Sequence, residues 1–271
     1  MKTTVIDGRP IDYDITEPAA GAPEGPALLL LSGWCQDHRL FDLVLPLLAR
    51  DHRVIRADWR SHGSDRTLEG DFGVAEQASD VIALLDELGV ERVVPVSTSH
   101  GGWANLEICG RLGTGRVPRA VVIDWLLTRP APEFAEGLRL GADPERWREG
   151  RQGLFDTWLA MADCPPVKRH LDEEMAGFDP ELWRLSCRVI ADAYATHGSP
   201  LERMREIGPR PIAHLFSQPG EESYLRAQEE FAARDPWFEP HRLGGRTHFP
   251  TLESPEAVAE RVTAFVAAGE R

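Results

Sequence analysis

One serine stands where a strand would turn sharply into a helix. The stretch VVPVSTSHGGW, residues 93–103, passes from an apolar, β-branched run through Ser99, flanked by small residues, into a helical pattern. This order is typical of a nucleophile elbow, in which a strained turn exposes the serine hydroxyl and requires small neighbours on both sides. Ser97 is a mild departure, because glycine is more usual there. The pattern predicts Ser99 as a candidate nucleophile, with a chance turn as the alternative.

A candidate base follows near the end of the chain. The segment GGRTHFP, residues 244–250, places His248 in a loop just before the last expected helix. A lone histidine is more often structural, but a fold with a nucleophile elbow delivers its base from this position. Backbone N–H donors for an oxyanion are expected from His100, directly after the serine, and from Trp34, in the SGWC stretch after the first long strand.

The acid that would orient His248 has two possible places. Asp124 ends the apolar run RAVVIDW, residues 119–125. A carboxylate at the carboxyl end of a buried strand is rare unless it is paired, so Asp124 is the simplest partner for the histidine. In the alternative, Asp124 caps a nearby loop, and Glu221 or Glu222 supplies the acid.

The elements that would position these residues alternate between strands and helices. Continuous apolar runs such as LLLL are typical of parallel strands buried on both faces. The alternation predicts an α/β fold with a mostly parallel sheet flanked by helices. The expected strands are 3–5, 11–15, 27–33, 52–58, 90–97, 119–125, 210–218 and 237–243, and the expected helices are 41–49, 74–88, 103–112, 221–233 and 256–268.

A region without strand-like runs interrupts this pattern. From about 128 to 205, tryptophans, prolines and short helical stretches replace the apolar runs. We therefore expect a helical cap at 128–205, inserted between core segments 1–127 and 206–271. The cap's tryptophans are individually most simply explained as packing residues.

Composition excludes some partners. The net charge of -14 argues against nucleic acid or an anionic membrane, since both require basic patches. No apolar run approaches the ~18 residues of a membrane span, and the four scattered cysteines contain no CxxC pair. These features predict free thiols and a cytoplasmic protein. The sequence carries no signal for an oligomeric state.

A metal centre is not expected. The one His-x-Asp pattern, His170-Leu171-Asp172, lies in a predicted helix, where residues two apart point in different directions. Such a pair is poorly placed for a facial triad. His62, in an Arg-x-His-Gly-like loop, is interpreted as structural.

Four segments together resemble one family. VSTSHGGW, VVIDWLL, SGWCQDHR and RTHFP resemble the cofactor-independent 3-hydroxy-4-oxoquinoline 2,4-dioxygenases, a branch of the α/β-hydrolase fold that includes alkylquinolone-signal dioxygenases. The selective features are the histidine directly after the serine, the aspartate followed by Trp-Leu-Leu, and Trp-Cys-x-Asp-His after the first long strand. The resemblance covers most of the chain and is weakest in the expected cap.

The resemblance implies a reaction with O₂ and no cofactor. The substrate would be a 3-hydroxy-4(1H)-quinolone with hydrogen, methyl or alkyl at carbon 2, cleaved to an N-acylanthranilate and carbon monoxide. His248, held by Asp124, would deprotonate the 3-hydroxyl, and imidazole suits this role because its pKa lies near working pH. Ser99 would hydrogen-bond the substrate oxygen without attacking it.

The resemblance also implies pocket residues. His38 and His100 would line the pocket, and Trp158 would lie near the substrate ring and oxygen. Some relatives carry a histidine just before the serine, where this chain has Thr98. That departure leaves the proposed His–Asp pair intact and bears on substrate preference.

Two other functions on the same fold are alternatives. A serine hydrolase, either an esterase or a carbon–carbon bond hydrolase, would employ Ser99, His248 and Asp124 as a triad through an acyl-enzyme. A non-catalytic ligand receptor is disfavoured, because it has no need to keep serine, histidine and aspartate together.

Overall fold

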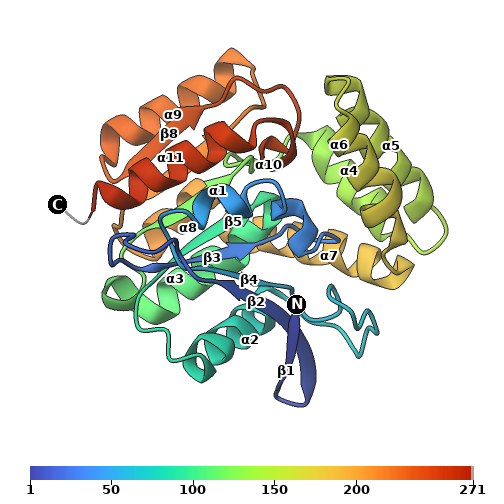
Figure 1. Ribbon diagram of the computed structural model, residues 1–271. Helices are drawn as coiled ribbons and strands as arrows, with labels where there is room; N and C mark the ends of the chain where they lie inside the picture. Colours follow the sequence, from blue (N-terminus) through green and yellow to red (C-terminus); the bar gives the residue numbers. More distant parts are fainter. Residues whose placement is uncertain (270–271) are drawn as a thin grey trace.

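The computed structural model describes residues 1–269, and its centre is one sheet (Figure 1). Within these residues the sheet has eight strands in the order β1-β2-β4-β3-β5-β6-β7-β8. In this order, the six strands β4, β3, β5, β6, β7 and β8 pair in parallel with their neighbours. The β1–β2 hairpin adds an antiparallel edge beside β4. Their bounds are β1 Lys2–Ile6, β2 Arg9–Thr16, β3 Ala27–Leu31, β4 Val54–Ala57, β5 Val93–Thr98, β6 Ala120–Ile123, β7 Ile212–Phe216 and β8 Phe238–Arg242.

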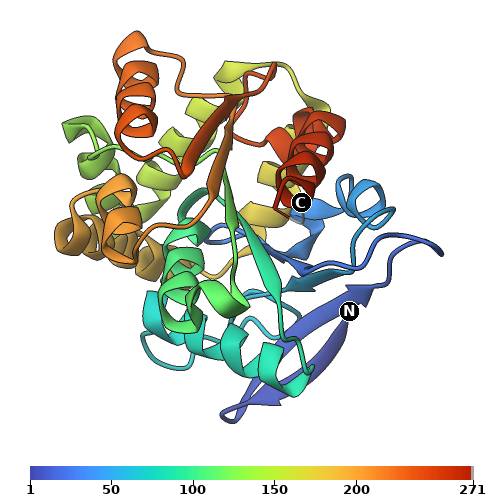
Figure 2. The ribbon, with the colours of Figure 1, turned by 90° about the vertical axis from the view of Figure 1, so that its left-hand side faces the viewer.

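Helices cover both faces of this sheet, as the alternating pattern predicts. Helices α1 and α11 pack together on one face, while α2 and α3 pack together on the other (Figure 2). Strands β3, β5, β6 and β7 are buried at every position, which explains their unbroken apolar runs. The helical bounds are η1 His38–Phe41, α1 Leu45–Leu48, α2 Val74–Glu87, η2 Ser99–Gly101, α3 Gly102–Arg116, α8 Pro200–Glu206, α9 Glu222–Arg234, α10 Pro250–Glu253 and α11 Pro255–Ala267.

One predicted helix is divided. The segment 41–49 was expected to form a single helix, but the chain instead forms the short turn η1 and a separate α1. Pro46 lies in the first turn of α1. Because proline has no backbone N–H to donate, it fits the start of a helix and breaks one that began earlier.

Four helices and two short turns follow β6 and lie together beside the sheet (Figure 1). We call α4 to α7 the inserted helices. Helix α4 packs on both α5 and α7. Their bounds are α4 Pro132–Ala142, α5 Trp147–Met161, α6 Pro165–Arg169, η3 His170–Glu174, η4 Met175–Gly177 and α7 Pro180–His197.

Two features bear on the chain's chemistry and environment. All four cysteines are unpaired. Within residues 1–269, none of the helices combines the length and the apolar character that a membrane crossing requires.

Two histidines inside the core are held in the neutral form. His62 Nδ1 lies 2.8 Å from the Arg60 carbonyl, and its Nε2 accepts from the Cys35 N–H at 3.1 Å. His214 is bound in the same way, by the Gln228 side chain at 2.6 Å and the Trp125 N–H at 3.3 Å. In each ring one nitrogen must accept, so a second proton has no place. Burial lowers the pKa of both rings to about 4.

This arrangement predicts a loss of stability in mild acid. The folded-state pKa of about 4 lies below the ordinary value of 6.5, so the unfolded chain binds more protons between these two pH values. The free energy of unfolding should therefore fall as the pH drops from about 6.5 to about 4. We expect the free energy of unfolding of His214→Gln, measured with urea, to change less steeply with pH over this range than that of the parent. The difference in slope should correspond to about one proton, roughly 1.4 kcal/mol per pH unit. Equal slopes in the parent and in His214→Gln would contradict the prediction.

Candidate active site

The serine elbow forms where the sequence predicts it. Strand β5 ends at Thr98, and Ser99 has a φ of +47°, in the left-handed region that side chains other than glycine rarely adopt. Close packing explains the two glycines that follow. A Cβ on Gly101 would collide with the Ser32 carbonyl, and one on Gly102 would collide with the Trp125 ring. The turn is thus strained, tightly packed and directed out of the sheet, as an elbow requires.

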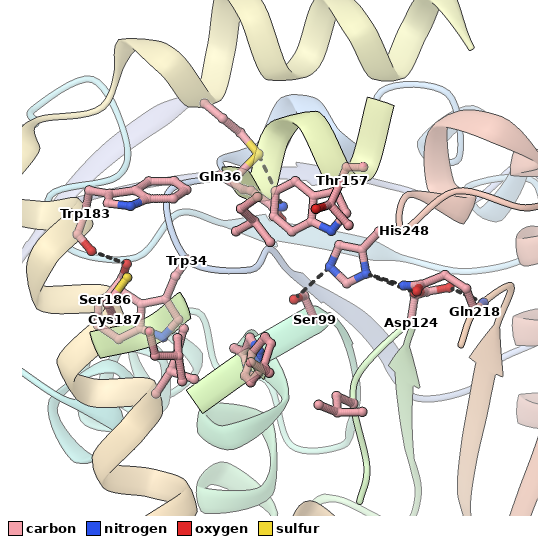
Figure 3. A pocket seen from close by; sticks show the side chains of 18 of the residues that line it. Trp34, Gln36, Ser99, Asp124, Thr157, Trp183, Ser186, Cys187, Gln218 and His248 are labelled. Carbon is pink, nitrogen blue, oxygen red and sulfur yellow. Dashed lines mark hydrogen bonds and ion pairs between the residues drawn. The ribbon is translucent and has the colours of Figure 1, made fainter. Parts of the chain in front are cut away.

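Three side chains converge at the carboxyl ends of the strands (Figure 3). Ser99 follows β5, Asp124 follows β6, and His248 lies in the loop between β8 and α10. His248 Nε2 is 3.0 Å from Ser99 Oγ, and His248 Nδ1 is 2.9 Å from Asp124 Oδ1. The structure therefore brings together the three residues that the sequence predicts as a catalytic set.

The Asp124 carboxylate is buried and fully occupied. Its exposed fraction is 2%, and its backbone φ is +45°. Oδ2 accepts from the backbone N–H groups of Ser217 at 2.7 Å and Gln218 at 3.4 Å. Oδ1 accepts from the Gln218 side chain at 2.7 Å as well as from His248. These donors stabilise the ionised form inside the protein.

The alternative acid is not supported. Glu221 is exposed and occupies the residue before helix α9, and Glu222 pairs with Arg226 one turn along that helix. Asp124, rather than either glutamate, contacts His248.

Glu253 holds the loop that carries His248, and sequence reasoning missed it. Its carboxylate accepts from the backbone N–H of Arg246 at 2.9 Å and from the N–H and hydroxyl of Thr247 at 2.6 and 2.7 Å. The Thr247 hydroxyl in turn accepts from the Phe249 N–H at 3.2 Å. The residues on both sides of the histidine are thus fixed by one side chain from α10. The only sequence signal is an acidic residue five positions after His248.

A partly open cavity of about 240 Å³ lies over these residues. Its polar wall includes Ser99, His100, Asp124 and His248. The other walls come mainly from the inserted helices and are largely apolar, and they include Phe134, Leu138, Leu154, Met161, Met175 and Ile190. The Ser99–His248–Asp124 set therefore lies on one side of a mostly apolar cavity, a setting in which electrostatic interactions are stronger than in water.

Aromatic rings surround the histidine. Trp158, from α5, stacks on His248 with ring centroids 5.0 Å apart and an interplanar angle of 9°. Trp34 and His100 also line the cavity. His100 Nδ1 accepts from the Trp125 indole N–H at 3.2 Å, and burial, with a contribution from His248, lowers the pKa of His100 to about 3. His100 is thus a neutral wall residue near pH 7.

His38 is not among the residues that line this cavity. Its ring Nδ1 lies 2.7 Å from Asp58 Oδ2, and its backbone N–H donates to the other oxygen of the same carboxylate at 2.7 Å. Burial lowers the pKa of His38, but the bond and charge of Asp58 outweigh that effect and raise it overall. The residue is held by the carboxylate that follows β4, and its contact with substrate stays a prediction from the resemblance.

The remaining polar residues from the sequence do not form a metal site. Residues 1–269 contain no cluster of three or more histidine, cysteine, aspartate or glutamate side chains that could hold a metal ion. His170 bonds Glu174 at 2.7 Å within a wide helical turn, while Asp172 pairs with Lys168. His170 and Asp172 therefore do not converge, as their helical spacing predicts.

Comparison with known proteins agrees with this geometry. Residues 28–261 match the model of the alpha/beta hydrolase family. The chain is 46% identical to a 1H-3-hydroxy-4-oxoquinoline 2,4-dioxygenase from Pseudomonas putida, over 99% of this chain and 100% of that protein. The chain belongs to the quinolone dioxygenase family.

Two further similarities support this membership. The chain is 44% identical to the 2-heptyl-3-hydroxy-4-quinolone dioxygenase AqdC2 of Rhodococcus erythropolis, with 96% of each protein covered. The structure of AqdC with its product, described for recognition and ring cleavage of the Pseudomonas quinolone signal, superposes with a TM-score of 0.94 at 42% identity, covering 98% of this chain and 100% of that one. The protein is a member of a group of ring-cleaving dioxygenases on the α/β-hydrolase fold.

The role of Glu253 can be tested by substitution. Glu253→Gln keeps the size of the side chain but removes its charge and one acceptor oxygen, so the loop should hold His248 less firmly. We expect turnover to fall by about tenfold or more, because small displacements of a reacting group are costly. Steady-state kinetics and the melting temperature should be measured together, with the exposed Glu256→Gln as the matched control. Parent-like turnover in a folded Glu253→Gln protein would contradict the assignment.

Proposed function

We propose that the protein is a cofactor-independent 2,4-dioxygenase. It cleaves a 3-hydroxy-4(1H)-quinolone carrying hydrogen, methyl or alkyl at carbon 2, and it forms an N-acylanthranilate and carbon monoxide. The observation that carries the proposal is His248 Nε2, which faces a mostly apolar cavity while Nδ1 is bonded to a buried carboxylate. The activities named for the relatives agree with this chemistry.

His248 acts as the general base. The substrate hydroxyl takes a place within reach of Nε2, the nitrogen that in the ligand-free site lies 3.0 Å from Ser99 Oγ. Transfer of the proton to Nε2 gives an imidazolium, which the Asp124 carboxylate stabilises through Nδ1. Trp158 covers one face of the ring and keeps water from it.

The resulting anion is bound by donors at the elbow. The loop at 32–34 runs along the serine, since a Cβ on Gly33 would lie 3.3 Å from Ser99 Cβ. The backbone N–H groups of Trp34 and His100 flank this position and stabilise the substrate oxyanion. The Ser99 hydroxyl adds a hydrogen bond to the same oxygen region.

The substrate anion supplies the electrons for the oxygen step. Dioxygen adds to carbon 2, the terminal peroxide oxygen closes onto carbon 4, and the O–O bond and the two bonds to carbon 3 break. Carbon 3 leaves with its own oxygen as carbon monoxide, and both atoms of O₂ remain in the N-acylanthranilate. The proton held on His248 returns to the product. No external reductant is needed, because the electrons come from the substrate.

The inserted helices act as a cap that excludes water. They contribute most of the apolar cavity wall and the ring of Trp158. This role corresponds to the expected cap at 128–205. The 2-substituent would extend among these apolar side chains.

A serine hydrolase remains the second candidate, and one observation favours it. The 3.0 Å contact between His248 Nε2 and Ser99 Oγ is also the geometry of an activated nucleophile. The two functions differ in what they require of Ser99.

Substitution of the three residues separates these functions. For a dioxygenase, His248→Ala should lower turnover by roughly 10²–10⁴-fold, as expected for loss of a general base, and Asp124→Ala should also lower it strongly. Ser99→Ala should cost less than about tenfold, whereas a hydrolase nucleophile would lose ~10⁴-fold or more. Steady-state kinetics on a 3-hydroxy-4-quinolone give the answer. A severe loss in a folded Ser99→Ala protein would favour the hydrolase.

The requirement for oxygen provides a direct test of the reaction. Absorbance of a 3-hydroxy-4-quinolone should decay in air and persist under strict anaerobiosis, and a trap should collect one carbon monoxide per substrate consumed. Metal and flavin content should be assayed in the same preparation. Consumption without oxygen, or without carbon monoxide, would refute the proposal.

A further inference from the structure

Gln218 contacts both members of the His248–Asp124 pair through a single atom. The residue lies in the turn after β7 and lines the cavity. Its Nε2 is 2.7 Å from Asp124 Oδ1 and 3.0 Å from His248 Nδ1, while that ring nitrogen is 2.9 Å from the same Oδ1 (Figure 3). The three atoms form a nearly equilateral triangle. Because each N–H has one direction, this triangle restricts where the protons can lie.

The carboxylate fixes the orientation of the Gln218 amide. An ionised carboxylate oxygen only accepts hydrogen bonds, so the Gln218 atom 2.7 Å from Asp124 Oδ1 must be the NH₂ group. In the flipped orientation, the amide oxygen would face another oxygen at that distance. One amide hydrogen is therefore committed to Asp124, and the second remains to be placed.

The second amide hydrogen has no acceptor at His248 Nδ1, because the same oxygen also fixes the proton on the ring. Nδ1 lies 2.9 Å from Asp124 Oδ1, and a lone pair there would face a negatively charged oxygen, so Nδ1 carries the hydrogen and donates it to Oδ1. Nε2 is then free to act as a base toward the cavity, where it lies 3.0 Å from Ser99 Oγ. The ring and the Gln218 amide therefore share one oxygen of Asp124.

We propose that Gln218 is a positioning residue that weakens His248 as a base. Its amide and the ring Nδ1–H donate to the same oxygen of Asp124, so the carboxylate holds the ring less strongly than it would alone. The imidazolium that forms when Nε2 takes a proton is disfavoured for the same reason, because the Gln218 amide already occupies the oxygen that would stabilise it. The role in turnover rests on the proposed function, whereas the shared oxygen is a property of the ligand-free protein.

The surroundings of His248 make this effect measurable. Asp124 is bonded to the ring, His100 and Cys187 also line the cavity, and the Ser99 hydroxyl does not titrate in this range. Burial raises the pKa of Cys187 to about 11, so its thiol stays neutral near pH 7. Burial lowers the pKa of His100 to about 3, so it stays neutral near pH 7. A change caused by removing the Gln218 amide therefore reports on the His248–Asp124 pair.

The test is a histidine titration in the ligand-free protein. In Gln218→Met the side chain keeps its length but loses the amide, so His248 should hold Asp124 Oδ1 with less competition. We expect its titration midpoint to rise by about half to one pH unit, the effect of one hydrogen bond. NMR of ¹⁵N-histidine-labelled protein gives this midpoint, and His248→Gln identifies the signal.

A matched control and a second variant secure the result. Gln36 also lines the cavity, but its amide bonds Gly33 and Met175 and makes no bond to the pair. Gln36→Met should leave the His248 titration unchanged. Gln218→Asn withdraws the amide by one methylene group and should shift His248 in the same direction as Gln218→Met. An unchanged midpoint in whichever of the two Gln218 variants folds would overturn the proposal.

The outcome is independent of the reaction assay. If the parent protein releases no carbon monoxide, the proposed function fails, and a shifted His248 signal still supports the role of Gln218. If carbon monoxide is released and the signal does not move, only the Gln218 proposal fails. With both correct, the acidic limb of the kcat/KM profile against pH should move upward in Gln218→Met by the shift seen in the titration.

Discussion

The site depends on the hydrogen bonds by which the protein holds the buried Asp124 carboxylate. The sheet supplies the means, because β6 and β7 are parallel neighbours with Ile123 opposite Leu215. This register brings the Ser217 and Gln218 backbone N–H groups to the residue that ends β6, where they bind Oδ2. The remaining oxygen can then hold His248. The chemistry of the cavity therefore begins with the pairing of two buried strands.

The same three side chains serve different reactions according to what surrounds them. A serine–histidine–aspartate set supports acyl transfer when the serine attacks a carbonyl. In this protein the set faces a cavity walled by apolar and aromatic groups, and Trp158 lies flat on the histidine. For the proposed reaction, such a wall suits an aromatic enolate, whose charge is delocalised. The reaction is thus governed by the cavity as much as by the residues at its polar wall.

The sequence predicts those parts of the site that follow from local pattern. Ser99 lies in a strand–turn–helix signature and Asp124 ends a buried strand, so both could be located without a structure. The β-strands were predictable because burial on both faces leaves unbroken apolar runs. Gln218 and Glu253 act through side-chain contacts across loops, which no spacing rule encodes. The direction of the His38 ring likewise depends on its contact with Asp58, which the sequence does not reveal.

The packing around His248 also restricts how its proton can travel. One face of the ring lies on Trp158, the edge of Phe249 packs nearby with centroids 5.2 Å apart, and both nitrogens are bonded. End-over-end rotation of the imidazole would break both of these bonds and displace the packed rings. In the proposed reaction a proton received at Nε2 therefore departs from that same atom, so the histidine is a reversible store rather than a relay to solvent.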